Sequence, residues 1–175
     1  TKTEWLQRRA ERREKQRATN AGRAEKMHTL RLEGRFSPQD NAAPPDETNF
    51  RYHVGCSGWF YWKWRGNFYP AEMSTSEWFN HYAQQFDTVE INASFYSWPT
   101  VANVKSWLRQ AGSREFVYTI KVCELITHVR KFENAETLVK DFGLIADILG
   151  DRMGCFLFQL PPSYRFTEER LIAIL

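Results

Sequence analysis

The sequence predicts an α/β protein whose four strand-like runs form a parallel sheet covered by helices, preceded by a charged N-terminal segment. Runs rich in β-branched and aromatic residues alternate with longer runs that carry apolar residues at helical spacing. The strand-like runs begin near residues 52, 88, 115 and 153, and this spacing is typical of repeated βα units. A shift in charge and aromatic content marks off the N-terminal segment.

The first 49 residues differ in composition from the rest of the chain. Of the 27 aromatic residues among 175, only Trp5 and Phe36 lie in residues 1–49. That segment carries 11 Lys and Arg against 8 Asp and Glu, whereas residues 50–175 carry 13 of each kind. The formal charge of +3 therefore belongs to residues 1–49, and the aromatic residues predict one packed domain in residues 50–175.

Residues 1–49 are expected to form a charged tail, helical or disordered, and a linker. Residues 4–26 favour a helix because Glu and Lys or Arg recur at i,i+4 spacing, but no apolar stripe is apparent, so this helix is expected to be solvated and to bury nothing. Residues 37–49 are rich in Pro, Asn and Asp and predict a linker. Residues 1–35 carry 11 basic and 5 acidic residues. Contact with nucleic acid is one interpretation of this charge, and a soluble helical extension is the one that the interspersed glutamates favour.

The first two predicted βα units lie between residues 52 and 110. Residues 52–56 predict a strand, followed by a loop rich in Gly, Pro and aromatic residues, and residues 75–85 carry aromatic residues at helical spacing. Residues 88–93 alternate polar and apolar side chains as a second strand does. Residues 101–110 predict a second helix, which a following glycine ends.

The next two units occupy the rest of the chain. Residues 115–122 predict a third strand, and residues 135–149 predict a third helix that ends at Gly150. Residues 153–160 predict a fourth strand ended by two prolines, and Thr167 opens a fourth helix. Because the chain stops on an apolar run, we expect this fourth helix to be truncated.

Cysteine usage and the lack of long apolar runs suggest a cytoplasmic protein. The longest uncharged apolar runs fall far short of the roughly 20 residues that span a bilayer, and the charged N-terminus is unlike a signal peptide. The three cysteines, Cys56, Cys123 and Cys155, have no C-x-x-C spacing and lie in apolar runs. We therefore expect buried thiols in a reducing compartment, with neither disulfides nor a zinc site.

Two architectures fit these elements: an open doubly wound sheet and a (β/α) barrel that lacks its second half. No Gly-rich phosphate-binding motif follows any predicted strand, so the phosphate loops of nucleotide-binding folds are absent. A complete barrel needs about 250 residues. Residues 50–175 would therefore supply about four of its eight βα units.

Polar side chains fall late in each predicted strand. Strand side chains alternate between the two faces, so Glu90 and Asn92 share one face, and Lys121 and Gln159 occupy comparable positions in the third and fourth strands. Ser57 ends the first strand. Barrel proteins place their sites where the carboxyl ends of parallel strands meet, so these residues predict a site at that edge.

Five motifs between residues 52 and 164 allow the family to be suggested. The stretch closely resembles the YecE-like family, known as domain of unknown function 72, through VGCSGW at 54–59, WRGNFYP at 64–70, TVEINASFY at 88–96, ITH at 126–128 and FQLPPSY at 158–164. The resemblance implies a TIM-barrel-like fold, which favours the barrel over the open sheet, but it implies no particular activity, substrate or cofactor. Residues 1–49 are not covered by it.

The resemblance further implies that the chain holds the N-terminal half of a YecE-like (β/α) barrel. The C-terminal half of the family's domain is absent from this sequence and is the expected partner of residues 50–175. A half-barrel leaves the edges of its first and last strands unpaired. We therefore expect the fragment alone to be poorly stable or to associate through those edges.

Glu90, Lys121 and His128 are the candidate catalytic residues. A desolvated Lys121 could form a Schiff base with a carbonyl substrate while Glu90 moves protons, but a buried ion pair between the two is the interpretation we favour. His128 follows the third strand on a loop over the barrel mouth, where it would be an acid or base or else a loop-stabilising hydrogen-bonding group. Glu90 and His128 could be two metal ligands, but no third ligand is identifiable, so no metal site is predicted.

The loop after the first strand is unusually aromatic and contributes candidate ligand-binding residues. It contains Trp59 and Arg65, and its rings would form an apolar lid or stacking platforms, while Arg65 would hold a phosphate or carboxylate. The candidate ligand-binding residues are Ser57, Trp59, Arg65, Asn92, Tyr96 and Gln159.

Together these features suggest a barrel that binds a small polar ligand, carbohydrate-like or phosphorylated. Whether it is an enzyme is left open; any reaction would use Glu90 and His128 as acid and base and Lys121 for electrostatic stabilisation. Two alternatives stay open: a nucleic-acid-associated protein that uses the basic tail and the barrel mouth, and a non-catalytic structural or regulatory module. The sequence predicts no membrane contact and identifies no cofactor.

Overall fold

A parallel four-stranded sheet organises the structure, a computed structural model that describes residues 2–35, 51–172 and 174. The strands are β1 (Gly55–Cys56), β2 (Thr88–Ile91), β3 (Val117–Lys121) and β4 (Met153–Leu157). They lie in the order β1-β2-β3-β4, and every neighbouring pair is parallel. All four carboxyl ends therefore meet at one edge of the sheet.

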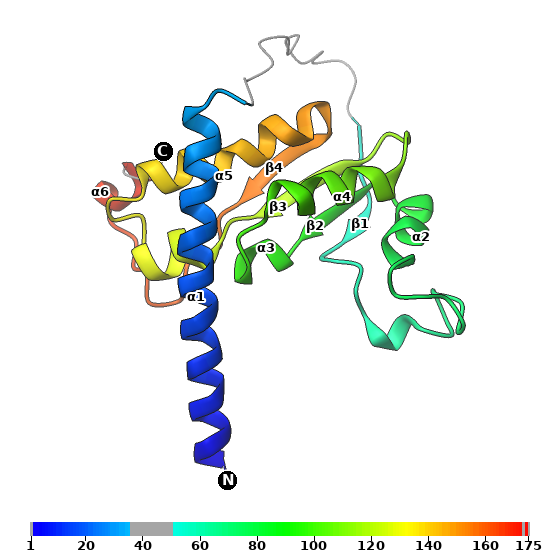
Figure 1. Ribbon diagram of the computed structural model, residues 1–175, viewed down its shortest axis with the longest axis horizontal. Helices are drawn as coiled ribbons and strands as arrows, with labels where there is room; N and C mark the ends of the chain where they lie inside the picture. Colours follow the sequence, from blue (N-terminus) through cyan, green and yellow to red (C-terminus); the bar gives the residue numbers. More distant parts are fainter. Residues whose placement is uncertain (1, 36–50, 173, 175) are drawn as a thin grey trace.

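Helices connect the strands and precede them (Figure 1). The longest, α1 (Lys2–Leu32), comes before the sheet. The others are α2 (Trp78–Gln85), α3 (Ala93–Tyr96), α4 (Val101–Ala111), α5 (Glu136–Leu149) and α6 (Glu168–Ile172), with short 3-10 turns η1 (Trp62–Trp64) and η3 (Gly150–Arg152) and a π-helical segment η2 (Leu125–Arg130). The mixed α/β class is thus confirmed.

Local sequence signals account for the bounds of α4. The Thr100 hydroxyl accepts a hydrogen bond from the Asn103 backbone N–H at 3.2 Å, and the Asn103 side chain accepts one from the Thr100 N–H at 3.0 Å. These two bonds satisfy backbone donors that a helix N-terminus leaves unpaired. The helix ends at Gly112, whose φ of 69° is favoured by a residue without a Cβ.

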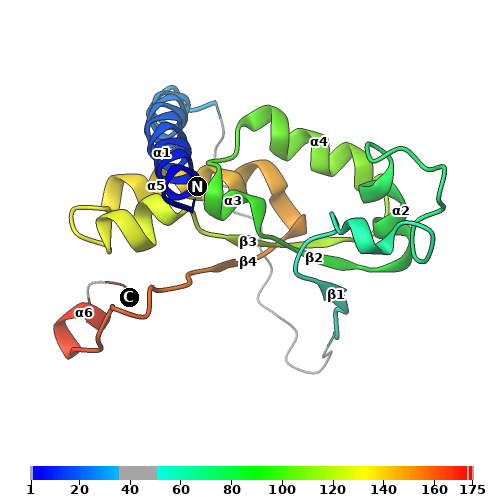
Figure 2. The same cartoon turned by 90° about the horizontal axis from the view of Figure 1, so that it is seen from below.

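Helices cover one face of the sheet and leave the other open. Figure 2 shows α1, α4 and α5 on the same side of the strands. Buried side chains on the covered face come from alternate strand positions, such as Ile91 and Ile120, whereas Glu90 and Lys121 lie on the opposite face and are half-buried. The alternation predicted from the sequence is therefore present. We call the second face the open face; its described side chains are Thr88, Glu90, Val117, Thr119, Lys121, Cys155 and Leu157.

The outer strands are shorter than the sequence predicts. The first strand is confined to Gly55–Cys56, and the fourth ends at Leu157, three residues before the predicted end. Within the described part of the chain each of these strands pairs on one side only, so fewer ladder hydrogen bonds extend them. The second strand ends at Ile91 because α3 begins at Ala93.

The prediction that all three cysteines are buried is wrong for Cys155. Cys123 is buried and Cys56 is half-buried, but Cys155 is exposed. Its strand position places it on the open face, in register with Thr119, whose hydroxyl oxygen lies 3.5 Å from the Cys155 sulfur. The apolar residues next to Cys155 in the sequence predict a strand, but they do not show that one face of the sheet lacks covering helices.

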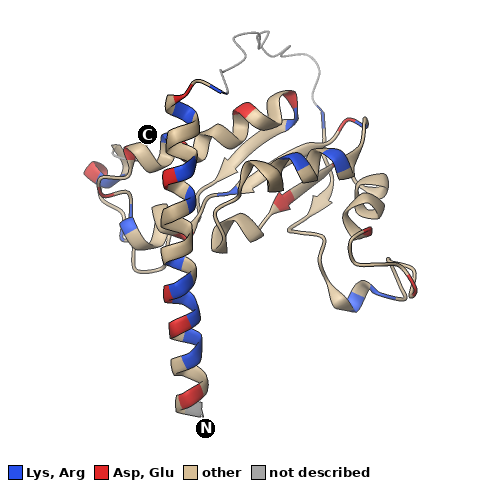
Figure 3. Ribbon diagram, viewed as in Figure 1, with Lys and Arg blue, Asp and Glu red and all other residues tan. Residues whose placement is uncertain are grey.

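The expectation that the N-terminal helix buries nothing is also wrong. The C-terminal half of α1 packs beside α5, and Ala24 and Met27 are each only 2% exposed in the main hydrophobic core. The N-terminal half projects beyond the rest of the molecule and carries many lysines and arginines (Figures 1 and 3). The predicted linker over residues 37–49 lies outside the described residues. None of the described helices is both long enough and apolar enough to span a membrane.

Candidate functional site

The carboxyl ends of β1 and β2 border a cavity of about 250 Å³. Ser57 follows β1 and Asn92 follows β2, and the Asn92 side-chain amide donates a hydrogen bond to the Ser57 hydroxyl. Three predicted ligand-binding residues are therefore brought together. The cavity is lined by Ser57, Gly58, Trp59, Phe60, Tyr61, Asn92 and Ala93. We call it the Ser57–Asn92 cavity.

Buried aromatic residues hold one wall of this cavity in place. The Trp59 ring lies 4.5 Å from that of Phe79 in α2, and the backbone carbonyl of Trp59 accepts a hydrogen bond from the Tyr69 hydroxyl at 2.5 Å. Tyr69 is fully buried and stacks on Trp78 at 4.4 Å. Burial raises the pKa of Tyr69, which keeps its hydroxyl protonated and able to donate. The aromatic loop is thus anchored to the core while Trp59 still borders the cavity.

Arg65 does not join this cavity. Its guanidinium donates to the Met73 carbonyl at 2.9 Å and lies 5.9 and 6.0 Å from the ring centroids of Trp62 and Trp78. These contacts fix the chain on the outer side of the aromatic loop. The structure therefore gives Arg65 a packing role at a distance from Ser57 and Asn92.

Lys121 and His128 meet at the ring of Phe95. The Lys121 ammonium lies 5.0 Å from the Phe95 ring centroid, and the His128 ring approaches the same ring edge-on at 4.9 Å. Phe95 belongs to α3, which directly follows Asn92, and is only 7% exposed. Phe95 was not predicted from the sequence, although it lies within the TVEINASFY motif.

The expected ion pair between Glu90 and Lys121 is not formed by the described residues. Glu90 is in register with Thr119, so Lys121 lies two residues further along β3, roughly 6–7 Å along the strand. The Lys121 ammonium instead lies over Phe95. The alternation of side chains along each strand placed Glu90 and Lys121 correctly on one face. It does not show which residue of one strand lies opposite which residue of the next.

His128 lies in the π-helical segment η2, a rare geometry that is frequent at functional sites. Its Nδ1 lies 2.9 Å from the Thr127 hydroxyl oxygen. Burial lowers the pKa of His128, and the positive charges of Lys121 and Arg13 lower it further, while Glu124 acts in the opposite sense. The imidazole is therefore biased toward its neutral form, which can accept a proton.

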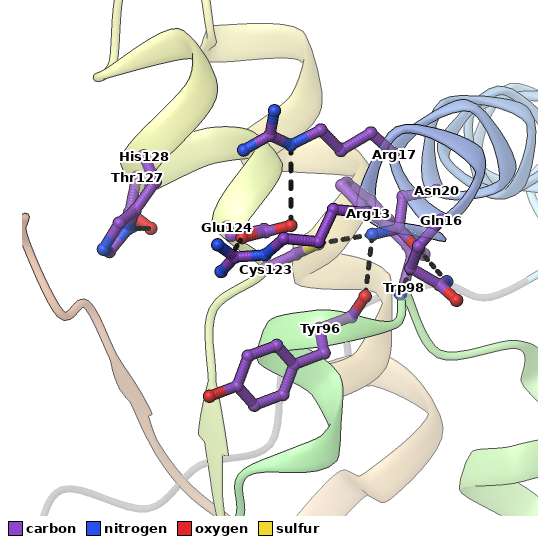
Figure 4. A network of polar contacts seen from close by, with 10 residues as sticks. All are labelled: Arg13, Gln16, Arg17, Asn20, Tyr96, Trp98, Cys123, Glu124, Thr127 and His128. Atoms are coloured by element: carbon purple, nitrogen blue, oxygen red, sulfur yellow. Dashed lines mark hydrogen bonds and ion pairs between the residues drawn. The ribbon is translucent and has the colours of Figure 1, made fainter. Parts of the chain in front are cut away.

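Glu124 is a buried carboxylate that the sequence analysis missed. It is 4% exposed, follows β3 by three residues and faces two arginines of α1 (Figure 4). The Arg17 Nε lies 3.7 Å from one carboxylate oxygen, and a terminal nitrogen of Arg13 lies 3.9 Å from the other. A lone acidic residue inside the apolar run VCELI was the sequence signal for this position.

Asn20 connects α1 to the residues that lie next to Glu124. It is fully buried, and its amide nitrogen donates to the Tyr96 carbonyl at 3.1 Å and to the Cys123 sulfur at 3.5 Å (Figure 4). Its amide oxygen accepts from the Trp98 backbone N–H at 2.9 Å. Asn20 thereby joins α1 to the ends of α3 and β3.

The remaining predicted residues lie apart from the Ser57–Asn92 cavity. Tyr96 is 58% exposed and faces the projecting part of α1 rather than that cavity. Gln159 is exposed beyond the end of β4, and Glu90 is half-buried on the open face. Among the residues that the structure describes, no group of three or more His, Cys, Asp or Glu side chains is placed to hold a metal ion.

Comparison with known proteins identifies the family. The family described as "Protein of unknown function DUF72" matches residues 53–175. The chain belongs to the DUF72 family. It is 24% identical over 125 residues to the UPF0759 protein YunF of Bacillus subtilis strain 168, covering 68% of this chain and 43% of that protein.

A solved DUF72 structure has a similar fold. The crystal structure of a DUF72 family protein from Enterococcus faecalis V583 at 3.10 Å resolution aligns with a TM-score of 0.54 and 19% identity, covering 70% of this chain and 44% of that one. The chain thus spans less than half the length of these two relatives. Ser57, Asn92, Lys121 and His128 fall inside the DUF72 match, whereas α1 lies outside it.

Proposed function

We propose that residues 53–175 form four consecutive βα units of a DUF72 barrel, and that the carboxyl edge of its strands binds a small polar ligand, carbohydrate-like or phosphorylated. The Ser57–Asn92 cavity is the observation that carries this proposal. It combines a hydroxyl and an amide with aromatic walls at the edge where parallel α/β proteins bind ligands.

The strand order supports the barrel part of the proposal. A doubly wound sheet reverses its strand order at a switch point and carries helices on both faces. Here the order is sequential, and α1, α4 and α5 lie on a single side (Figure 2). In a barrel the open face would become the lumen, which would enclose Glu90, Thr119 and Lys121.

The cavity chemistry favours a ligand with several hydroxyl groups. The Ser57 hydroxyl and the Asn92 amide can both donate and accept hydrogen bonds, so they suit hydroxyl groups, which do the same. The Trp59 ring offers a flat apolar surface for the C–H face of a sugar ring. The Tyr61 hydroxyl donates to the Ser57 carbonyl and so orders the loop that carries Ser57.

Lys121 and His128 would extend this site toward charged ligands. Lys121 ends β3, at the same sheet edge as Asn92, and its ammonium would favour a phosphorylated ligand over a neutral one. The lowered pKa of His128 makes its imidazole a suitable proton acceptor near neutral pH. Any acid–base reaction at this site would therefore use His128 as the base, with Lys121 stabilising negative charge.

Calorimetric titration of the full chain with a hexose, a hexitol and a hexose monophosphate tests the proposal. We expect at least one of these probes to bind, and Ser57→Ala and Asn92→Ala to weaken its binding about tenfold, as expected when a hydrogen bond worth about 1.4 kcal/mol is lost. Lys121→Met is expected to weaken binding of the monophosphate selectively.

A matched control is Asn80→Ala, because Asn80 is an exposed residue of α2 whose amide bonds the Gln110 carbonyl outside the cavity. This variant should bind as the wild type does. Absence of binding by all three probes at millimolar concentrations, or equal weakening by Asn80→Ala and Asn92→Ala, would contradict the proposal. Unchanged binding in all the cavity variants would mean that the probe binds elsewhere on the molecule, and it would also contradict the proposal.

A further inference from the structure

A second cavity lies between the projecting half of α1 and the body of the molecule. Its volume is about 370 Å³, and it shares no lining residue with the Ser57–Asn92 cavity. The residues that line it are Trp5, Arg9, Arg12, Arg13, Gln16, Tyr96 and Glu124. We call it the α1 groove. It combines three guanidinium groups with two aromatic rings.

Helix geometry separates the charges that the sequence interleaves. Trp5, Arg9, Arg12, Arg13 and Gln16 lie within one face of α1, because an α-helix turns about 100° per residue. By the same geometry the glutamates of this half of the helix, at positions 4, 11 and 14, lie on the far side. The groove side of α1 is therefore basic even though acidic residues are interspersed along the sequence.

Ion pairs within the protein neutralise only part of the positive charge on the groove side of α1. Glu124 is the only acidic residue among those that line the described groove, and it already faces both Arg13 and Arg17. Arg12 donates its Nε to the Arg8 carbonyl at 3.3 Å, and the Arg9 guanidinium lies 5.3 Å from the Trp5 ring centroid. Arg9 and Arg12 therefore add positive charge beyond what balances Glu124.

Both aromatic rings of the groove are exposed, although Arg9 lies over the Trp5 ring. Trp5 is 54% exposed and Tyr96 is 58% exposed, although both are large apolar side chains. Tyr96 is held by its backbone, since its carbonyl accepts a hydrogen bond from the buried Asn20. Gln16 is positioned by the same residue, because its amide donates to the Asn20 side-chain oxygen at 3.0 Å.

We propose that the α1 groove binds a nucleotide through its phosphate and its base. Guanidinium groups recognise phosphate oxygens with paired N–H donors, and exposed aromatic rings stack on bases of any sequence. Arg9 and Arg12 would hold the phosphate, and Tyr96 would stack on the base. The same chemistry is offered by a free nucleotide and by one unit of a single-stranded nucleic acid, and separate probes distinguish these sources.

Two probes test the full-length chain at low salt: adenosine monophosphate, and a short fluorescein-labelled single-stranded oligonucleotide followed by anisotropy. We expect Arg9→Gln/Arg12→Gln to weaken binding roughly tenfold, as two charge-assisted contacts to phosphate are lost. For the oligonucleotide, the slope of log affinity against log salt should fall by about 0.7, the contribution of the one phosphate that Arg9 and Arg12 hold. Tyr96→Ala should weaken binding roughly tenfold through lost stacking.

The control variant Arg8→Gln/Lys15→Gln removes the same charge from exposed positions of α1 that do not line the groove. Glutamine is a good helix former, so circular dichroism should show equal helix content in both double variants. Binding of either probe that only the groove variant weakens supports the proposal and identifies the source. Equal weakening by both double variants, or no binding of either probe, would overturn it. Neither outcome depends on the Ser57–Asn92 cavity.

Discussion

Arg31 of α1 donates a hydrogen bond from its Nε to the Asp141 carboxylate of α5 at 2.7 Å. Asp141 is 2% exposed, and the His28 Nδ1 lies 3.1 Å from the same carboxylate oxygen. The second buried carboxylate of the described domain, Glu124, likewise faces arginines of α1. A helix outside the DUF72 match thus supplies the counter-charges for acidic side chains buried within it.

Removing Arg31 should therefore destabilise the fold. We expect Arg31→Ala to lower the free energy of unfolding by about 2–3 kcal/mol, because the buried Asp141 loses its closest cation and keeps only His28. Urea unfolding at neutral pH measures this change. The control is Arg35→Ala, which removes an exposed ion pair with Glu33 and should cost less than about 1 kcal/mol. If the two substitutions lowered the free energy of unfolding equally, a stabilising role of the contact between Arg31 and Asp141 would be contradicted.

Asn20→Ala should also be strongly destabilising. It deletes both amide donations and leaves the buried Trp98 backbone N–H without its acceptor, so we expect a loss of about 2–3 kcal/mol. Asn80→Ala removes two exposed hydrogen bonds, one donated to the Gln110 carbonyl and one accepted from the Gln84 amide, and should cost less than about 1 kcal/mol. A thermal unfolding midpoint of Asn20→Ala equal to that of Asn80→Ala would contradict the role of Asn20 as the anchor of α1.

The packing of α1 shows why sequence periodicity alone was insufficient. The face that docks contains Asn20, Ala24, Met27 and Arg31, whose spacing is helical, but only two of the four are apolar. Asn20 and Arg31 occupy positions of the docking face where an amphipathic helix usually carries apolar residues. The spacing of apolar residues alone therefore did not reveal this face. The helix itself was predictable from its composition, whereas its docking depends on acceptors and carboxylates more than 70 residues away in the sequence.

The candidate site was predictable where residues follow a strand directly. Ser57 and Asn92 directly follow β1 and β2, and Lys121 ends β3, so the parallel topology alone places them at one edge. Gln159 was expected inside the fourth strand, but β4 ends at Leu157 and Gln159 lies beyond it. Contacts such as that of Lys121 with Phe95 depend on side-chain direction after the strand, about which alternation contains no information.

Gly55 has a steric requirement that a mutation can test. A Cβ at this position would clash with the Thr88 carbonyl oxygen and lie 2.8 Å from the carbonyl carbon, because β1 approaches β2 closely. We expect Gly55→Ala to lower the free energy of unfolding by about 1–3 kcal/mol. Gly22→Ala is the matched control: nothing lies within 4 Å of its Cβ position, and in a helix it should raise stability by about 0.5–1 kcal/mol. Chemical unfolding that shows the two substitutions to be equivalent would be incompatible with this close approach.

Stability should fall as the solution is acidified through the titration of His128. The folded pKa of His128 lies below its ordinary value of 6.5, so the unfolded chain binds the proton more readily than the folded chain. Its contribution to stability is therefore present above pH 6.5 and is lost as the pH falls toward the folded pKa. Urea unfolding between pH 7.5 and pH 5 should show a smaller loss in His128→Gln than in the wild type. An NMR titration midpoint of His128 above 6.5 would contradict this sign.

The most direct test of the proposed ligand site is a high-resolution crystal structure of the full chain. The protein would be purified without added ligand and then soaked with whichever hexose, hexitol or hexose monophosphate binds in calorimetry. The account predicts density for a hydroxyl-bearing molecule over Trp59, with hydrogen bonds to Ser57 and Asn92. Density for the ligand elsewhere on the molecule, with only solvent between Ser57 and Trp59, would contradict it.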